Sequence, residues 1–467
     1  MRSISSHRRR AVYALLALAP ALLAGCQNSI TDSLLSAEQT GLIDPSNVNS
    51  AAGADAVRLG TLINLRNITN AWTQSGLVGD EWDITVSASI TGFVDQRRGS
   101  NPFAISAFTS TLRTLASVRT SANQAIPLLT KWTPSPVANI AEMYFARGMA
   151  ELEIASDFCN GIPLDDGNAN PVVWSAPLSS QQIFDVAVAS FDTAIAKAGG
   201  TDAASLNINR AARIGKARAL IGQGKFAEAA AVVPVASVPT TYAYNFTFAT
   251  TSGNNPIWTL NASGRQYSIG DSVEGNNRNI IVPGVIPFFS AKDLRLPASY
   301  TVSNNGRDTT RGSDGVTYLR ATTLYGQTTA MAAVSGVDAR LVEAEARLAA
   351  GDIAGMMTIL NALRATTVTI GTVTVGAAQL APLATPATKD AATNLLFRER
   401  AFWTFGRGQR LGDMRRLIRQ YGRTQEQVYP TGTYPTGGGT YGDDLVFPLG
   451  PDENGNPNFK GCTDLKA

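Results

Sequence analysis

Histidine is almost absent from this chain of 467 residues, in which the only example is His7. It lies among the arginines that precede an apolar run from Ala11 to Ala24, and this order is typical of a secretory signal. Once such a segment is cleaved, the mature protein has no imidazole. We therefore exclude a Ser-His-Asp or Cys-His nucleophile pair within the mature chain, and with it the commonest ligand of zinc and iron.

Cysteine is also scarce, and the first of the three is Cys26. The sequence Leu23-Ala24-Gly25-Cys26 matches the bacterial lipobox, in which a lipid is attached to the cysteine and the chain is cut just before it. An ordinary signal peptide that happens to contain a cysteine is the alternative. We predict that residues 1–25 are a lipoprotein signal peptide and that residues 26–53 are a lipidated, flexible tether.

The other two cysteines are Cys159 and Cys462. An even pair in an exported protein is a candidate disulfide, because the compartment is oxidising. Two unpaired thiols are the alternative, since spacing along the chain does not show proximity in space. A bridge would tie the C-terminal tail to the middle of the chain.

The net positive charge of the chain comes from the signal segment. The formal net charge of the chain is +3, and removal of the four arginines in residues 1–25 takes it to −1. Such a balance in an exported protein does not favour nucleic-acid binding. No GxxxxGK[ST] phosphate loop is present, and GRGQRLG at 406–412 lacks the strand–turn–helix context of a dinucleotide site.

Helical spacing of apolar residues dominates from about Ala54, and it predicts a mainly α fold in a single domain, residues 54–467. Residues 209–233 and 336–365 each indicate two helices around a short glycine turn, which resembles irregular tetratricopeptide-like hairpins. Between them, about 234–329 is rich in Thr, Asn, Ser, Gly and aromatics, and predicts a loop-rich insertion with short strands. Residues 366–377 alternate in polarity and predict a small β-hairpin.

Three motifs point to a known family. Residues 141–164, AEMYFARGMAELEIASDFCNGIPL, form an Ala- and Arg-containing helix that ends in Gly-Ile-Pro-Leu, and an Ala-Glu-Ala helix begins at Arg340. The third motif is a C-terminal signature that comprises Glu399, Arg400, Gly408, Arg410, Asp413, Arg415 and Arg416, then Phe447-Pro448 and Asn456-Pro457. Together they resemble the SusD/RagB family of nutrient-binding lipoproteins. Trp403 and Arg407 stand where that family usually has glutamate, which puts the usual local salt bridges in question.

The resemblance implies a function and a location. Members of the family have a tetratricopeptide-like scaffold, sit on the cell surface in the outer membrane, and cap a SusC-like TonB-dependent transporter to which they deliver glycans or, in some cases, peptides. We therefore expect a binding protein without catalysis or cofactor. Two alternatives remain open, a lipid-anchored helical-repeat scaffold for protein assembly and a glycan-degrading enzyme.

Neutral sugars bind to aromatic faces with polar side chains around them, so aromatics near loops are the candidates for ligand contact. The candidates share a loop context and side chains that can stack or form hydrogen bonds. They are Trp82, Trp258, Arg265, Tyr267, Asn254, Asn255 and Asn277. The competing interpretation for each aromatic residue is that it packs beneath its own loop.

Acidic clusters give little support for catalysis. The acids of DEWD at 80–83, and Asp165-Asp166, are adjacent in sequence, whereas glycoside hydrolysis needs two carboxylates that flank one bond in space. No calcium-loop spacing is present, so we assign no metal.

The arginine-rich stretch FWTFGRGQRLGDMRR, 402–416, could at first sight contact nucleic acid. Asp413 is three residues from both Arg410 and Arg416, a spacing that favours ion pairs on one helix face. We therefore predict a structural role, with Phe402 and its neighbouring aromatics packed inward.

Overall fold

The folded part of the chain begins earlier than its sequence indicates. The computed structural model describes residues 48–86, 90–99, 101–168, 173–275, 277–302, 309–450 and 456–467. Ser50 caps the first described helix, because its hydroxyl accepts a hydrogen bond from the Gly53 amide at 3.1 Å. The end of the expected tether therefore belongs to the folded body. The predicted signal peptide and Cys26 lie outside the described residues.

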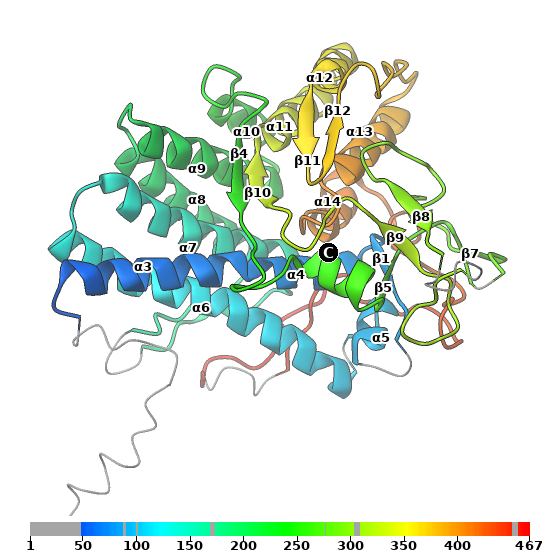
Figure 1. Cartoon of the computed structure of the whole chain (residues 1–467), viewed down its shortest axis with the longest axis horizontal. Helices are drawn as coiled ribbons and strands as arrows, with labels where there is room; N and C mark the ends of the chain where they lie inside the picture. Colours follow the sequence, from blue (N-terminus) through cyan, green and yellow to red (C-terminus); the bar gives the residue numbers. More distant parts are fainter. Residues whose placement is uncertain are drawn as a thin grey trace, which may run out of the picture. The chain divides into compact units, whose positions relative to one another are not determined.

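Helices are the main regular structure of the body, as Figure 1 shows. Their bounds are α3 Ala51–Arg66, α4 Ile68–Val78, α5 Ile90–Asp95, α6 Pro102–Trp132, α7 Val137–Asp157, α8 Ser180–Lys197, α9 Ala203–Gly222, α10 Phe226–Val232, α11 Gly336–Ala349, α12 Ile353–Ala365, α13 Lys389–Trp403 and α14 Arg410–Tyr421, with a π-helix η2 at Trp258–Ser263 and a 3-10 turn η3 at Gln425–Gln427. Helix α6 contacts α3 and α7, and α8 contacts α7 and α9. The mainly α prediction is confirmed, and the two expected hairpins are α9 with α10 and α11 with α12.

Phe191 on α8 shows how closely these helices approach one another. Its ring lies where both neighbouring helices carry a glycine, Gly148 on α7 and Gly215 on α9. A Cβ atom at Gly215 would lie 2.4 Å from the ring, and one at Gly148 would lie 2.8 Å from it. Both distances are shorter than carbon atoms tolerate, so the small residues of these helices serve close packing around a large aromatic side chain.

The strands form short antiparallel pairs. Their bounds are β1 Trp82–Ile84, β2 Ile162–Pro163, β3 Pro177–Leu178, β4 Ala243–Phe246, β5 Tyr267–Ile269, β6 Val273–Glu274, β7 Ile280–Ile281, β8 Ala298–Tyr300, β9 Arg320–Thr322, β10 Met331–Ser335, β11 Val368–Ile370 and β12 Val373–Val375. Strand β4 pairs with β10, and β5 pairs with β1. The start of the loop-rich segment is thus paired with the strand that follows its end, its middle is paired with β1, and β11 with β12 forms the expected hairpin.

The arginine-rich stretch is buried inside the body. Arg400 donates two hydrogen bonds to the Asp413 carboxylate, at 2.7 and 2.9 Å, and Arg416 donates to Asp413 at 2.7 Å and to Glu345 on α11. All four side chains are at most 5% exposed. Although burial raises it, the charges of the two arginines lower the pKa of Asp413 to about 2. The predicted structural role is therefore observed.

One expected pair is wrong, because Arg410 does not contact Asp413 but donates to both oxygens of Asp80, at 2.6 and 2.7 Å. Asp80 lies just before β1, so this contact joins segments 330 residues apart. The spacing along α14 predicts only contacts on the same helix, whereas a buried guanidinium pairs with whichever carboxylate the fold brings to it.

The two departures from the family signature are also buried. Trp403 is 1% exposed, as are Phe402 and Phe405, so the three aromatics face inward as predicted. Arg407 makes a bidentate ion pair with Asp338 on α11, with distances of 3.0 and 2.6 Å. Arg407 thus forms a salt bridge with a different helix, α11, in place of a local one.

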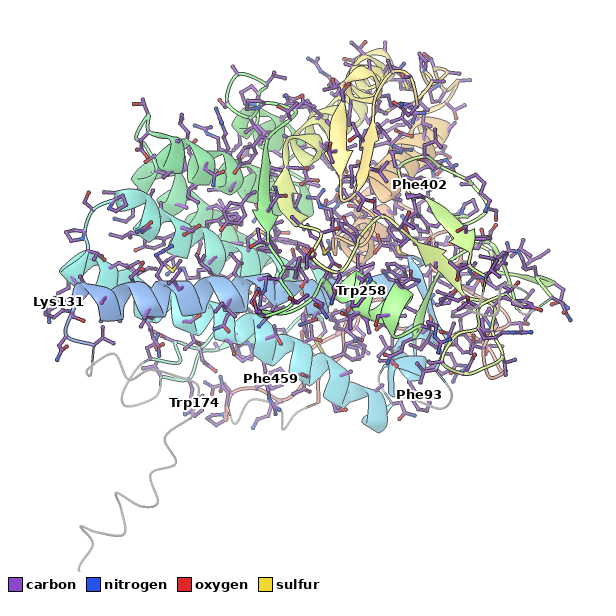
Figure 2. The ribbon with its side chains drawn as sticks, in the orientation of Figure 1. Phe93, Lys131, Trp174, Trp258, Phe402 and Phe459 are labelled. Carbon is purple, nitrogen blue, oxygen red and sulfur yellow. A yellow bond between two sulfur atoms is a disulfide. The ribbon has the colours of Figure 1, made fainter. Side chains whose placement is uncertain are left out.

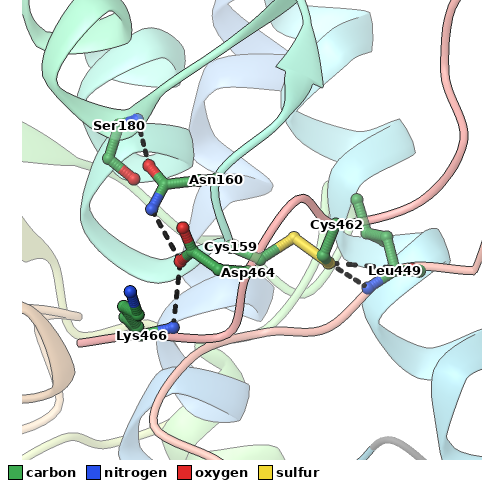
Figure 3. Close-up of a disulfide and its surroundings, with 7 residues drawn as sticks. All are labelled: Cys159, Asn160, Ser180, Leu449, Cys462, Asp464 and Lys466. Carbon is green, nitrogen blue, oxygen red and sulfur yellow. Dashed lines mark hydrogen bonds between the residues drawn. A yellow bond between two sulfur atoms is a disulfide. The ribbon is translucent and has the colours of Figure 1, made fainter.

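Cys159 and Cys462 form a disulfide, with sulfur atoms 2.07 Å and Cα atoms 5.7 Å apart (Figure 3). The Asn160 side chain supports the same junction, since its amide donates to Asp464 at 2.9 Å and its carbonyl oxygen accepts the Ser180 amide at 2.8 Å. The C-terminal tail is thereby fixed to the end of α7 and the start of α8.

We expect replacement of both bridged cysteines by alanine to lower the free energy of unfolding by about 2–5 kcal/mol, because the bridge closes a loop of 303 residues and restricts the unfolded chain. Denaturant unfolding without reductant measures the loss. Reductant should destabilise the wild type and leave the double variant unchanged; identical midpoints for the wild type with and without reductant would contradict the prediction.

Glu81 is a buried carboxyl beside the arginine network. Its Oε1 accepts a hydrogen bond from the Gly406 amide at 2.9 Å, while Oε2 has no partner among the described residues. Burial, with a smaller contribution from Asp80, raises the pKa of Glu81 to about 8. The folded chain therefore holds a proton at neutral pH that the unfolded chain releases.

The stability that this proton contributes is fully present below pH 4.5, the pKa of the Glu81 carboxyl in the unfolded chain. It is lost as the pH rises towards about 8, the pKa in the folded chain. Glu81→Gln keeps an acceptor for Gly406 without the titration. We expect this variant to exceed the wild type in free energy of unfolding by roughly 1–3 kcal/mol at pH 7 and by much less at pH 5. Denaturant unfolding between pH 5 and 8.5 measures it. The exposed Glu228→Gln serves as the control, and a pH-independent difference for Glu81→Gln would refute the assignment.

Candidate functional site

Two of the aromatic candidates are core residues. Trp82 is 2% and Tyr267 is 3% exposed, on the paired strands β1 and β5. The Trp82 ring lies 4.8 Å from Phe405 and 6.2 Å from Tyr267, measured between centroids. The prediction that they contact ligand is wrong for this structure. Asp80, just before β1, pairs with the buried Arg410, and β1 therefore runs into the core.

Asn255 is also buried, with no exposed surface. Its amide nitrogen donates to the Thr329 carbonyl at 2.9 Å, and its side-chain oxygen accepts the Ile257 amide at 3.0 Å. The half-buried Asn254 accepts from Gln327 at 3.2 Å. Asn255 is therefore a structural residue that holds the entry to η2, and its prediction as a ligand contact is wrong.

The remaining candidates lie nearer the surface. Trp258 is half-buried on η2, whereas Arg265 and Asn277 are exposed. Figure 2 shows Trp258 near the middle of the view and Phe93 of α5 at its lower right. None of the seven predicted residues lines the groove or the cavity described below.

A groove lies between the end of β1, helix α5 and two loops, 314–317 and 434–438. This groove has a volume of about 620 Å³, within the usual range for a small-molecule site. Its lining residues are Ile84, Val86, Gly92, Phe93, Gln96, Asp314, Val316, Thr317, Tyr434, Pro435, Thr436, Gly437 and Gly438.

The groove combines apolar and polar surface. The half-buried Phe93 ring and the exposed Val316 supply apolar contact area. Thr436 supplies a hydroxyl with no hydrogen-bond partner in the part of the chain that the structure describes. An aromatic ring with nearby hydroxyl and amide groups is the arrangement that binds the apolar face and the hydroxyls of a sugar.

Arginine and glutamine side chains hold the 430–441 loop in place. The buried Arg97 donates to the Pro430 carbonyl at 2.7 Å and to the Asp444 carbonyl at 3.0 Å. Gln96 donates to the Thr440 carbonyl at 2.9 Å. One wall of the groove is therefore fixed by contacts that cross more than 330 residues of sequence, which provides a preorganised surface.

The polar base of the groove is hydrogen-bonded within the protein. Asp95 accepts the Tyr434 hydroxyl at 2.7 Å and the Ile84 amide at 2.8 Å. Burial, reinforced by the charge of Asp83, raises the pKa of Asp95 well above its usual value. Beside it, Arg320 pairs with both Asp83 and Glu274. These groups support the walls of the groove.

Asp314, the only carboxylate among the described residues that line the groove, is committed to its own turn. Its oxygens accept from the Val316 and Thr317 amides, both at 2.9 Å, and from the Thr317 hydroxyl at 2.6 Å. A glycosidase needs two carboxyl groups that flank the scissile bond, and the groove does not supply such a pair. Its arrangement is suited to binding.

Sequence reasoning missed the groove residues because they come from four separate segments. The run TYPTGGGTY at 433–441, two tyrosines around three glycines, was the available signal. Gly437, Gly438 and Gly439 all have φ near +80°, a conformation that favours glycine. Nothing in the sequence links this loop to Phe93.

Two features are absent from the described residues. These residues contain no group of three or more His, Cys, Asp or Glu side chains that could hold a metal ion. No helix among them is long and apolar enough to cross a membrane.

Comparison with known proteins was informative only through structure. No family model matches the chain, and no curated protein matches its sequence. A SusD homolog from Bacteroides thetaiotaomicron is similar, with a TM-score of 0.61, 14% identity, and coverage of 90% of this chain and 98% of the homolog. A SusD superfamily protein from Bacteroides vulgatus has a TM-score of 0.60, 15% identity, and coverage of 88% and 98%.

A third similar structure is described as a SusD-like carbohydrate binding protein from Bacteroides vulgatus, with a TM-score of 0.54, 13% identity, and coverage of 84% of this chain and 89% of that protein. The likeness spans 89% or more of each of these three proteins. The chain therefore has the mainly α fold of the SusD superfamily.

Proposed function

We propose that this protein is a member of the SusD/RagB family that binds a neutral oligosaccharide in the groove without cleaving it. The observation that carries the proposal is the groove itself, an aromatic and hydroxyl-lined surface. Its single carboxylate among the described lining residues, Asp314, is occupied by three hydrogen bonds. Affinity in such a site comes from apolar burial against Phe93 and from directional hydrogen bonds. The likeness to a structure described as carbohydrate binding supports the same ligand class.

We further propose that the protein is a lipoprotein of the outer membrane, anchored through Cys26, exposed at the cell surface, and paired with a SusC-like TonB-dependent transporter that takes the bound ligand. The lipobox and the SusD-like fold support this proposal. The groove needs no cofactor to bind a sugar, since stacking and hydrogen bonding suffice.

We expect Phe93→Ala to weaken oligosaccharide binding at least tenfold, about 1.4 kcal/mol, because the ring supplies apolar contact area in the groove. Isothermal titration calorimetry with maltoheptaose, cellohexaose, xylohexaose and mannohexaose measures the affinity. Phe226→Ala removes a similarly half-buried ring from α10, outside the groove, and should leave the affinity unchanged. Equal affinities for the wild type and Phe93→Ala would exclude the groove, and release of shorter sugars by the purified protein would favour an enzyme.

We expect Cys26→Ser to move the protein from the membrane fraction to the soluble fraction, because one acyl-bearing residue provides the anchor.

Protease treatment of intact cells should degrade the wild type and spare a periplasmic marker. Complete protection of the wild type would contradict surface exposure and would favour a scaffold that faces the periplasm.

A further inference from the structure

A second cavity lies apart from the groove, and the two departures from the C-terminal signature meet there. It has a volume of about 410 Å³ and lies between the β4–β10 pair and the β11–β12 hairpin. Trp403 and Arg407 both line it, together with Tyr325. We call it the strand cavity. It shares no lining residue with the groove.

The strand cavity has an exposed rim and a buried base. Thr241, Asn245, Thr367 and Thr369, from both strand pairs, are exposed at its edge. Tyr325, Trp403 and Arg407 at its base are each at most 3% exposed. A site with this form admits a small molecule through a polar edge and buries it against aromatic surface, which is the usual anatomy of a ligand pocket.

The charge of the strand cavity is balanced within the protein. Among the residues that the structure describes, Arg407 is the only charged one that lines it. Its two terminal nitrogens bond Asp338 at 3.0 and 2.6 Å, and its Nε donates to the Ala332 carbonyl at 2.8 Å. An anionic ligand would therefore compete with a bidentate carboxylate already in place, and a cationic ligand would meet no free carboxylate. The pairing favours a neutral ligand.

Polar groups without partners remain at the strand cavity. The Tyr325 hydroxyl and the Asn245 side chain form no hydrogen bond within the described parts of the chain, and both residues line the cavity. Val337, Val368 and Ile370 supply apolar wall. A hydroxyl on a buried residue is normally hydrogen-bonded, so the Tyr325 hydroxyl, together with the exposed Asn245 amide at the rim, indicates a ligand that carries both hydroxyl groups and apolar surface.

We propose that the strand cavity is a second binding site, for a neutral polyhydroxylated molecule of one or two sugar rings. The volume, the neutral balance around Arg407, the free Tyr325 hydroxyl and the rim amide of Asn245 carry this assignment. The site does not depend on oligosaccharide binding in the groove. Trp403 and Arg407 thus form the base of a binding site as well as part of the core.

The test uses the full-length mature protein labelled with 5-fluorotryptophan. Fluorine NMR resolves signals from the six tryptophans, and Trp403→Phe assigns the signal of Trp403. Glucose, xylose, maltose and cellobiose are titrated separately. We expect at least one of them to shift the Trp403 signal in a saturable way, and the same shift should persist in Phe93→Ala, which disables the groove.

Tyr325→Phe removes only the unpartnered hydroxyl, and we expect it to weaken that titration by about five- to tenfold, the usual cost of a lost hydrogen bond. Tyr144→Phe makes the same chemical change on α7, outside both sites, and should titrate like the wild type. Asn245→Ala on the exposed rim should weaken binding as well, and it provides a second measurement if Tyr325→Phe does not fold.

The outcomes are distinct. No shift of the Trp403 signal with any of the four sugars, or equal affinities for the wild type, Tyr325→Phe and Asn245→Ala, overturns the proposal for the strand cavity. A Trp403 shift that disappears in Phe93→Ala overturns it too, because the sugar would then act through the groove. Loss of oligosaccharide binding in Phe93→Ala with an intact Trp403 titration supports both sites separately.

Discussion

The pairing of buried arginines with buried carboxylates around α13 and α14 is the constraint on which the rest of the structure depends. Arg410 holds Asp80 before β1, and Arg416 holds Glu345 on α11. Removal of one partner from such a pair costs about 3–5 kcal/mol, because a charge is left unpaired away from water. The network therefore fixes how the C-terminal helices, α11 and the first strand meet.

The groove depends on that arrangement. Once Asp80 is fixed, β1 runs into the core, Trp82 packs against Phe405, and the end of the strand becomes a wall of the groove. Arg97 then fixes the opposite loop by binding two backbone carbonyls. The rigid parts are ion pairs and helix packing, while the surface that meets a ligand is built from loops, an arrangement common to binding proteins.

The fold could be predicted further than the site. Periodicity located the hairpins α9–α10 and α11–α12 and the β11–β12 hairpin, because local spacing directly reports which face of a helix or strand is buried. The site residues could not be located that way. Trp82 and Asn255 lie in loop-like sequence yet are buried, whereas Phe93 lines the groove. A single side chain is buried when other residues pack over it, and those residues come from distant segments of the chain.

The helical body, the absence of an imidazole after His7 and the structural character of the arginine-rich stretch could be read from the sequence alone, which also made Cys159 and Cys462 candidates for a bridge. Each follows from composition or from short-range spacing. Only the tertiary structure decided that Arg410 pairs with Asp80 and not with Asp413, and that α5 and the 434–438 loop share a groove. Electrostatic pairing and cavity shape depend on positions in space, and residues more than 300 apart in the chain supply both sides of each contact.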